Sequence, residues 1–349
     1  MRGFPYNGRM SVFSNIREIA AATFGLDGHM KRRKYRTMSG NANVYEIIYD
    51  DGNPVRVMNV RGTYQSATYL EEDCYELVFG YHRAYNAMFQ AEGAPAAGEL
   101  VANRRPGARK PSDLIAPGRG NAGQGNSGHG NAGQGRSGHA PGGFRIERVA
   151  MLGGGGFSYP KYLVAHYPHI SVDVVEVDPM VVAIAERWFY LDRLMAEFDT
   201  EENGRLGVHV ADARDFLETC SGGYDAIVND CFAARVPVMS LATVEAARTI
   251  HARLNPGGLY LTNVISALRG PRAKLLHSVM ATLQREFAHV HVLPGSEGLP
   301  RLVDNYVVVA TDGDYEFAHS INVEPDPGTQ FLVDARVPEY EDEFFLIDT

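Results

Sequence analysis

Three acidic side chains of this chain stand at or just after runs of residues that are typical of buried strands. Glu176 lies near the end of the run at 171–177, Asp212 follows the run at 205–211, and Asp230 ends the run at 224–230. In a doubly wound parallel sheet, ligands bind at the carboxyl ends of the strands. Carboxylates there can accept hydrogen bonds, and they can orient or deprotonate an amine. The spacing therefore predicts one shared ligand site.

Four consecutive glycines follow the first predicted strand, "RIERVAML". Glycine lets the backbone turn tightly and approach a ligand closely, so Gly153, Gly154 and Gly155 are predicted to lie against the ligand. The dinucleotide fingerprint would place its third glycine at 158, where Ser158 stands instead. A tight turn without a ligand is the alternative interpretation of this loop.

Each acid has a predicted role and a structural alternative. Glu176 is placed to accept hydrogen bonds from both ribose hydroxyls, and the alternative is a surface acid before a helix. Asp212, with Ala213, is placed to meet an adenine amino group, and the alternative is a helix N-cap, although the two roles can coexist. Asp230 is the predicted catalytic carboxylate, with a loop cap as its alternative.

Together these features describe a ligand that carries adenosine without a phosphate. The chain has no G-x-x-x-x-G-K-[ST] loop, and no arginine stands beside Glu176 to bind a 2′-phosphate. A sulfonium nucleoside fits this description, either S-adenosylmethionine or its decarboxylated form. Transfer from a sulfonium is an in-line displacement that requires close alignment and a deprotonated nucleophile. We therefore predict one of these nucleosides as co-substrate, and no metal.

The elements that must position these residues follow from the alternation of strands and helices after residue 144. Asp178 precedes Pro179 and is expected to cap a helix. Continuous apolar strands favour an α/β fold with a doubly wound, mostly parallel sheet. Alternating runs between 44 and 70 predict a small β domain before it. Helices are expected at 157–167, 179–190, 213–219, 243–254 and 272–286.

The predicted organisation has five parts. The parts are a helical and basic lead at 1–40, a small β domain plus helix at 41–90, a disordered Gly/Ala/Asn-rich insert at 91–143, a Rossmann-like nucleoside-binding catalytic domain at 144–325, and an acidic tail at 326–349. The insert contains a near-perfect ten-residue repeat at 120–139, and with this composition it cannot bury enough apolar surface to fold.

Composition excludes several classes of protein. The chain has 349 residues, a formal net charge of -9 and three cysteines without disulfide-like or metal-like spacing. The negative charge argues against general nucleic-acid binding, and no apolar run reaches the roughly 18 residues that span a bilayer. The basic run at 31–36 is interpreted as a solvated connector, with a nucleic-acid or membrane contact as the alternative. We expect a cytoplasmic protein without membrane or nucleic-acid partners.

The motifs resemble those of the spermidine synthase (polyamine aminopropyltransferase) family, within the S-adenosylmethionine-dependent methyltransferase-like fold. The likeness covers roughly 42–90 and 144–312. "GGGG" is similar to the start of G-G-G-D-G-G, "VEVDP" to E-[IVL]-D, "ADARDFL" to G-D-[AG]-x-x-[FW], and "YDAIVNDCF" to Y-D-[VL]-I-[ILV]-x-D. The resemblance implies that Glu176 binds ribose, that Asp212 binds adenine and that Asp230 is the catalytic acid.

The N-terminal part adds a further match. "RGTYQSATYLEEDCYE" resembles the family's L-D-G-x-x-Q-x-x-x-x-D-E-x-x-Y. This likeness implies that Gln65 contacts the donor's tail, and Tyr75 fits the substrate tyrosine with a one-residue slip. The resemblance also implies a small-molecule amine acceptor and a homodimer.

Departures from the family pattern keep several functions open. Gly156 and Ala233 stand where the family has acids for an amine, and Y-P-x-G-x-W-x-F is missing near 293–300. The first hypothesis is an aminopropyltransferase-like enzyme, and the loss of these acids favours the second, a methyltransferase. A nucleoside-binding protein without turnover is the third hypothesis. An NAD dehydrogenase is the fourth, and Ser158 argues against it.

Overall fold

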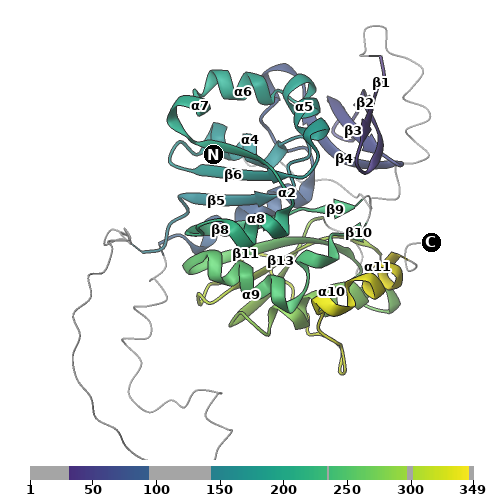
Figure 1. The fold of residues 1–349 in the computed structure, drawn as a ribbon, viewed down its shortest axis with the longest axis vertical. Coiled ribbons are helices and arrows are strands. Elements are labelled where there is room, and N and C mark those ends of the chain that lie inside the picture. Colours follow the sequence, from purple (N-terminus) through teal and green to yellow (C-terminus); the bar gives the residue numbers. More distant parts are fainter. Residues whose placement is uncertain (1–30, 94–142, 234–235, 297–301, 346–349) are drawn as a thin grey trace, which may run out of the picture.

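The computed structural model of the chain describes residues 31–93, 143–233, 236–296 and 302–345, which form two sheet units (Figure 1). A small antiparallel sheet comes first, and a larger, mostly parallel sheet with helices on both faces follows. This arrangement confirms the predicted α/β fold with a preceding small β domain. The repeat at 120–139 and residues 1–30 lie outside the described residues.

The small sheet has four antiparallel strands in the order β1-β2-β3-β4. Tight turns join them where turn signals stand in the sequence: Arg61 and Gly62, between the last two strands, have φ values of 51° and 86°. Two consecutive positive φ values give a two-residue turn whose twist suits the flanking strands. The strands are β1 (Arg33–Thr37), β2 (Gly40–Ile48), β3 (Pro54–Val60) and β4 (Thr63–Tyr69).

The basic run at 31–36 is part of this sheet, so its interpretation as a connector is wrong. Residues 33–36 belong to β1, which pairs with β2 and forms the edge of the sheet. The guanidinium of Arg33 lies 5.9 Å from the ring centroid of Trp188, the one tryptophan of the chain. Exposed charges on an edge strand discourage pairing with another chain. The small sheet therefore begins before the predicted boundary at 41.

Short helical segments lead from the small sheet to the larger unit. The sequence predicts a helix over 75–89, but the first regular turn begins at Gly80. Leu77 and Val78 explain the difference, because these consecutive side chains are buried in two different cores, which an extended backbone allows. The segments are η2 (Glu71–Asp73), α2 (Gly80–Ala84) and η3 (Tyr85–Ala91).

The larger sheet has seven strands in the order β12-β13-β11-β8-β5-β6-β7. Strand β13 runs antiparallel to both of its neighbours, and the pairs from β11 to β7 are parallel. The sequence predicts strands at 145–152, 171–177, 205–211, 224–230, 257–264, 289–294 and 305–311, and all seven are present. They are β5 (Arg148–Leu152), β6 (Ser171–Glu176), β7 (Leu206–Val210), β8 (Tyr224–Asn229), β11 (Leu254–Ser266), β12 (His289–Pro294) and β13 (Asp304–Thr311).

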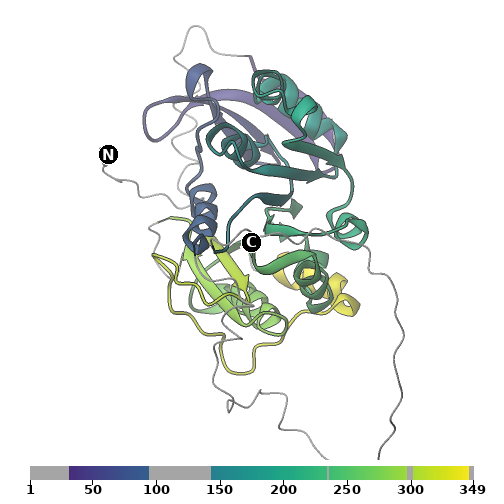
Figure 2. The same ribbon diagram turned by 90° about the vertical axis from the view of Figure 1, so that its left-hand side faces the viewer.

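Helices cover both faces of this sheet, and each face has its own core (Figures 1 and 2). Along β5, Val149 and Met151 pack into one core, while Ala150 and Leu152 pack into the other. This alternation is the period-two pattern of a strand buried on both faces. No helix in the described part of the chain is long and apolar enough to cross a membrane.

The five expected helices are present within about three residues of their predicted ends, and further short elements accompany them. The helices are α4 (Ser158–His166), α5 (Pro179–Trp188), α6 (Leu191–Glu197), α7 (Thr200–Asn203), α8 (Ala213–Thr219), α9 (Val244–Arg253), α10 (Lys274–Leu283) and α11 (Val337–Phe345). Shorter elements are β9 (Phe232–Ala233), β10 (Val236–Pro237), η5 (Met239–Leu241), η6 (Pro271–Ala273) and η7 (Asp334–Arg336).

A buried lysine joins the small sheet to the larger unit. Lys161 of α4 is 1% exposed, and its Nζ donates to the carbonyl oxygens of Phe189 and, at 3.2 Å, Cys74. A third contact, 3.4 Å long, reaches the hydroxyl of Thr68 in β4. Burial lowers the pKa of Lys161 to about 7, because the ammonium loses its water shell and gains no carboxylate partner in these contacts.

Candidate functional site

A cavity of about 150 Å³ lies between the carboxyl ends of the main strands and the small sheet. This is the edge where ligands bind in doubly wound folds. The structure brings all eight predicted site residues into its lining, and their roles stay predictions. Residues from both units line it, among them Thr37, Ser39, Gln65, Ser66, His82, Gly153, Gly154, Gly155, Glu176, Asp212, Ala213, Asp230, Val238 and Leu241.

Glu176 at the end of β6 is bound to the glycine loop. Its Oε2 accepts the backbone N–H groups of Gly154 and Gly155, both at 3.1 Å, and its Oε1 accepts that of Asp178 at 3.0 Å. Burial raises the pKa of Glu176, and these hydrogen bonds, which favour the charged form, oppose that shift. The carboxylate therefore fixes the loop next to β6, and Oε1 retains capacity for one more donor.

The glycine loop requires its glycines because atoms of other segments lie against it. A Cβ on Gly153, whose φ is 89°, would stand 2.7 Å from the carbonyl oxygen of Asp230. A Cβ on Gly155, with a φ of 51°, would stand 2.7 Å from Oγ of Ser66. Only glycine combines these φ values with such close approach at low cost. The loop therefore brings β5, β8 and β4 together around the cavity.

The fourth glycine faces a closed corner. The N–H of Gly156 donates to Oγ of Ser66 at 2.6 Å. A Cβ on Gly156 would stand 2.7 Å from Cδ1 of Phe189 and 2.8 Å from Cβ of Ser66. The position that carries an acid in the resembling family thus has no room for a side chain here.

Asp212 takes the structural role that was its alternative interpretation. Its carboxylate caps α8 and accepts the backbone N–H groups of Arg214 at 2.7 Å and Asp215 at 3.2 Å. The side chain is exposed at the mouth of the cavity, and the neighbouring Ala213 is buried in the wall. Asp178 caps α5 in the same way, as predicted, through Met180. Capping uses Oδ1 of Asp212, so an adenine contact through Oδ2 is compatible with it.

Asp230 lies directly after β8 and is held by three side chains. Its Oδ2 accepts the hydroxyl of Tyr81 at 3.1 Å and lies 3.4 Å from Nε2 of His82. Its Oδ1 accepts the side-chain amide of Asn263 at 3.0 Å. The carboxylate is 12% exposed, so it is mostly removed from water. Side chains from two elements therefore hold this carboxylate in one orientation, and its catalytic role stays a prediction.

Two polar atoms beside Asp230 have no hydrogen-bond partner among the described residues. They are Nδ1 of His82 and Oδ1 of Asn263, and both side chains are more than nine-tenths buried. Buried polar groups without partners are costly, so such atoms commonly mark the place of a ligand or water. Burial and the negative charge of Asp230 raise the pKa of Tyr81 well above its usual value, which keeps its hydroxyl a donor at neutral pH.

Tyr81, His82 and Asn263 were missed by the sequence interpretation, which considered Tyr75 instead. The hydroxyl of Tyr75 donates to Glu197 at 2.9 Å, on an exposed surface outside the cavity. The available signal was the polar Asn263 inside the apolar run "GGLYLTNVIS", because a buried amide requires partners. The adjacent Tyr81 and His82 gave no spacing signal, because a chain turn of irregular length precedes α2.

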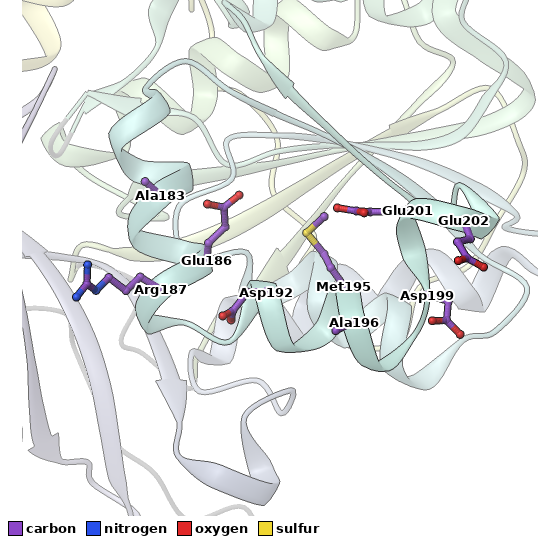
Figure 3. Close-up of a pocket in the computed structure, with 9 residues that line it drawn as sticks. All are labelled: Ala183, Glu186, Arg187, Asp192, Met195, Ala196, Asp199, Glu201 and Glu202. Atoms are coloured by element: carbon purple, nitrogen blue, oxygen red, sulfur yellow. The ribbon is translucent and has the colours of Figure 1, made fainter.

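A second, larger hollow of about 660 Å³ lies on the outer surface between α5, α6 and α7 (Figure 3). It contains none of the predicted residues and stands away from the carboxyl edge of the sheet. In Figure 3, Arg187 extends away from the other labelled side chains. Size alone does not make it the functional site, so we assign that site to the smaller cavity. Its acidic lining residues are Glu186, Asp192, Asp199, Glu201 and Glu202.

Metal binding has no support within the residues that the structure describes. No group of three or more His, Cys, Asp or Glu side chains there could hold a metal ion.

Comparisons with known proteins found both aminopropyltransferases and a methyltransferase among the similar sequences. The polyamine aminopropyltransferase of Vibrio vulnificus is 32% identical over 148 residues, which cover 42% of this chain and 45% of that protein. The spermine synthase of Arabidopsis thaliana is 27% identical over 179 residues, or 50% of this chain and 48% of that protein. The human eEF1A lysine and N-terminal methyltransferase is 28% identical over 155 residues, or 41% of this chain and 20% of that protein. The chain thus spans less than half the length of each of these relatives.

Structural comparison extends the likeness to the fold. A probable spermidine synthase from Corynebacterium glutamicum superposes with a TM-score of 0.58 at 18% identity, covering 87% of this chain and 97% of that chain. At that identity the superposition shows a common fold. Residues 138–291 match the family model described as the spermine/spermidine synthase domain. The resemblance expected from the motifs is thereby confirmed over this part of the chain.

Proposed function

We propose that the chain is a transferase that moves an aminopropyl group from decarboxylated S-adenosylmethionine to a small-molecule amine. The observation that carries this proposal is the surroundings of Asp230. A mostly buried carboxylate, a tyrosine hydroxyl and two polar atoms without partners among the described residues lie together at the carboxyl edge of the sheet. The family relationship of residues 138–291 supports the same reaction.

The nucleoside half of the proposed site consists of the glycine loop, Glu176 and the wall formed by Asp212 and Ala213. Oε1 of Glu176 has one backbone donor, so it can accept a ribose hydroxyl without losing an existing contact. The loop glycines Gly153, Gly154 and Gly155 leave the backbone open to the donor, and Gln65 is proposed to face the donor's tail.

The acceptor half is proposed to bind an amine next to Asp230. An ammonium donates hydrogen bonds, so Asp230 and the free Oδ1 of Asn263 suit it, whereas Nδ1 of His82 can accept or donate according to tautomer. In the transfer, the amine nitrogen forms a bond to the carbon next to sulfur while the carbon–sulfur bond breaks. The departing electron pair stays on sulfur as a neutral thioether. Asp230 orients the amine and takes up its proton.

The direct test is incubation with decarboxylated S-adenosylmethionine and putrescine, followed by mass spectrometry. The proposal predicts methylthioadenosine and an aminopropylated amine from the wild type, and neither from Asp230→Asn. Asp192→Asn is the matched control, since Asp192 lines the outer acidic hollow and its loss should change nothing. Equal activity of Asp230→Asn and wild type would refute the proposed role.

Methyl transfer is the second candidate, and the closed corner at Gly156 favours it. No side chain fits there, so an acid for the transferred amine cannot stand at that position. A matched relative is named as a methyltransferase. Under this alternative, S-adenosylmethionine would be converted to S-adenosylhomocysteine, and decarboxylated donor would not be consumed.

We further propose that the protein is a homodimer in the cytoplasm and binds neither nucleic acid nor membranes. The family relationship supports a small-molecule partner. Sedimentation analysis would test the dimer, with a mass near twice 38.3 kDa as the expected result. A single species at the monomer mass would contradict it.

A further inference from the structure

The C-terminal segment is packed against the wall of the cavity. The sequence interpretation describes 326–349 as an acidic tail, yet α11 contacts η5 and β10 (Figure 1). Leu332, Tyr340 and Phe344 are buried in the core on that face of the sheet. The carbonyl oxygen of Leu332 accepts the backbone N–H of Val244 at 2.9 Å, and the N–H of Leu332 donates to Oγ1 of Thr282 at 2.8 Å.

Arg214 connects this segment to the cavity. Its Nη2 donates to Oδ2 of Asp334 at 2.9 Å, and its Nη1 donates to the carbonyl oxygen of Ser240 at 2.8 Å and lies 3.3 Å from Oδ1 of Asp334. The two-pronged contact has the fork geometry that distinguishes arginine from lysine. One guanidinium thereby joins α8, η5 and η7.

Asp334 is tied on its other side to the start of α9. Its Oδ1 also accepts the hydroxyl of Thr243 at 2.5 Å, and its backbone N–H donates to Oε2 of Glu245 at 3.1 Å. Thr243 is itself the N-cap of α9 and accepts the N–H of Ala246. The carboxylate therefore lies between two helix starts.

These contacts lie directly behind the side of the cavity that is assigned to adenine. Asp212 and Ala213, which precede Arg214, line the cavity, and so do Val238 and Leu241, which flank Ser240. The two lining segments are a helix start and a three-residue turn, and both have side chains in the core on this face. Arg214 joins the two segments through Ser240, and Asp334 holds its guanidinium.

We propose that Arg214 and Asp334 are a positioning pair that holds the adenine wall, so that the C-terminal segment takes part in binding the nucleoside. This inference rests on the proposed function, because it assumes that an adenosine-bearing donor occupies the cavity. The pair touches neither the ribose nor the transferred group. It should therefore affect every ligand that carries adenine by the same factor.

The test is calorimetry of the full chain with S-adenosylhomocysteine and with 5′-methylthioadenosine. Asp334→Asn removes the charge and keeps the shape. We expect the Kd of both nucleosides to rise by the same factor, about fivefold, a modest change because Asp334 is 41% exposed. The binding stoichiometry should stay unchanged, whereas a folding defect would lower the stoichiometry and leave the affinity of the folded fraction intact.

Two further variants define the interpretation. Arg214→Lys keeps the charge but loses the fork, and it should also weaken both nucleosides equally. Arg336→Ala removes a pair with Glu339 on the same segment, away from the cavity, and should bind as the wild type does. Wild-type affinity of Asp334→Asn, or weakening confined to S-adenosylhomocysteine, would overturn the inference alone. A wild type that binds neither nucleoside would overturn the proposed function and this inference together.

Discussion

The two halves of the cavity are built in different ways. On the nucleoside side, Glu176 accepts three backbone N–H groups, two of them from the loop of the preceding strand–helix unit. On the acceptor side, Asp230 is held by side chains from α2 and β11, which are far away in the sequence. In the first half, backbone N–H groups provide the hydrogen-bond partners of the carboxylate. The second half retains two buried polar atoms without partners among the described residues.

The first half is therefore preformed, whereas the second is completed only when a ligand binds. Backbone hydrogen bonds fix the loop whether or not a nucleoside is bound. We therefore expect the nucleoside to bind first and to change the structure of its half little. The acceptor half keeps unmet hydrogen-bonding capacity, which an amine would fulfil. Substitutions on the two sides should therefore separate binding from turnover.

The largest expected effect is on the acceptor side, from Asp230→Asn. An amide cannot take up the proton of the amine, so kcat should fall by roughly a hundredfold to ten-thousandfold. Nucleoside affinity should stay within about twofold, because Asp230 does not contact the ribose loop through its side chain. Single-turnover kinetics and calorimetry measure the two quantities, and an equal loss in both would remove the distinction between the halves.

Glu176→Gln should have the reverse signature. The charged hydrogen-bond acceptor for ribose is lost, so the donor Kd should rise by roughly tenfold to a hundredfold. At saturating donor, kcat should stay close to that of the wild type. A variant with normal donor affinity and a lower kcat would show that Glu176 acts in the acceptor half of the cavity.

Lys161 offers a stability test on the nucleoside side, where α4 meets the small sheet. In the unfolded chain a lysine titrates near its ordinary value of 10.5, while burial lowers the pKa in the folded chain to about 7. Between these values the unfolded state binds more protons, so the free energy of unfolding should rise with pH. Below pH 7 both states are protonated and the full burial penalty is present.

The measurement compares chemical denaturation of the wild type and Lys161→Met at pH 7 and pH 9. The wild type should gain stability relative to the variant by about 2 kcal/mol over this interval, at most about 1.4 kcal/mol per pH unit. The variant keeps all other titrating groups, so subtracting its free energy of unfolding from that of the wild type at each pH removes their contributions. A stability difference that does not change with pH would show that Lys161 keeps its ordinary pKa.

The smallest expected effect is that of Tyr81→Phe. This change removes one hydrogen bond to Asp230, leaves the ring stacked on Phe79 and should lower kcat by about threefold to tenfold. Tyr75→Phe is the matched control, because the hydroxyl of Tyr75 contacts only Glu197 on the surface among the contacts described above. A larger loss in the Tyr75 variant would restore the sequence-based assignment.

The lining of the proposed nucleoside half was predictable because each of its residues belongs to a short local motif at a strand end, while the roles of these residues stay predictions. Gly153, Glu176 and Asp212 each stand at or just after the end of a predicted strand. Their places in the cavity lining could therefore be predicted from the strand ends alone. The seven strands of the main sheet were predictable for the same reason, since each is a continuous apolar run bounded by turns.

The acceptor half was predictable only at Asp230. Tyr81 and His82 reach it through a segment whose extended and short helical parts follow from packing of Leu77 and Val78, which local spacing does not encode. The closed corner at Gly156 depends on Ser66 and Phe189, which approach from two other segments. The sequence showed that an acid was missing there, and tertiary packing explains why none fits.

The most direct test of the account is identification of the nucleoside released when wild-type protein is given both sulfonium donors and putrescine. Aminopropyl transfer at Asp230 predicts methylthioadenosine, formed by the wild type and by Asp192→Asn but not by Asp230→Asn. S-adenosylhomocysteine in its place would establish methyl transfer. Release of neither nucleoside, or undiminished release by Asp230→Asn, would contradict the central claim that this cavity carries out transfer from a sulfonium nucleoside at Asp230.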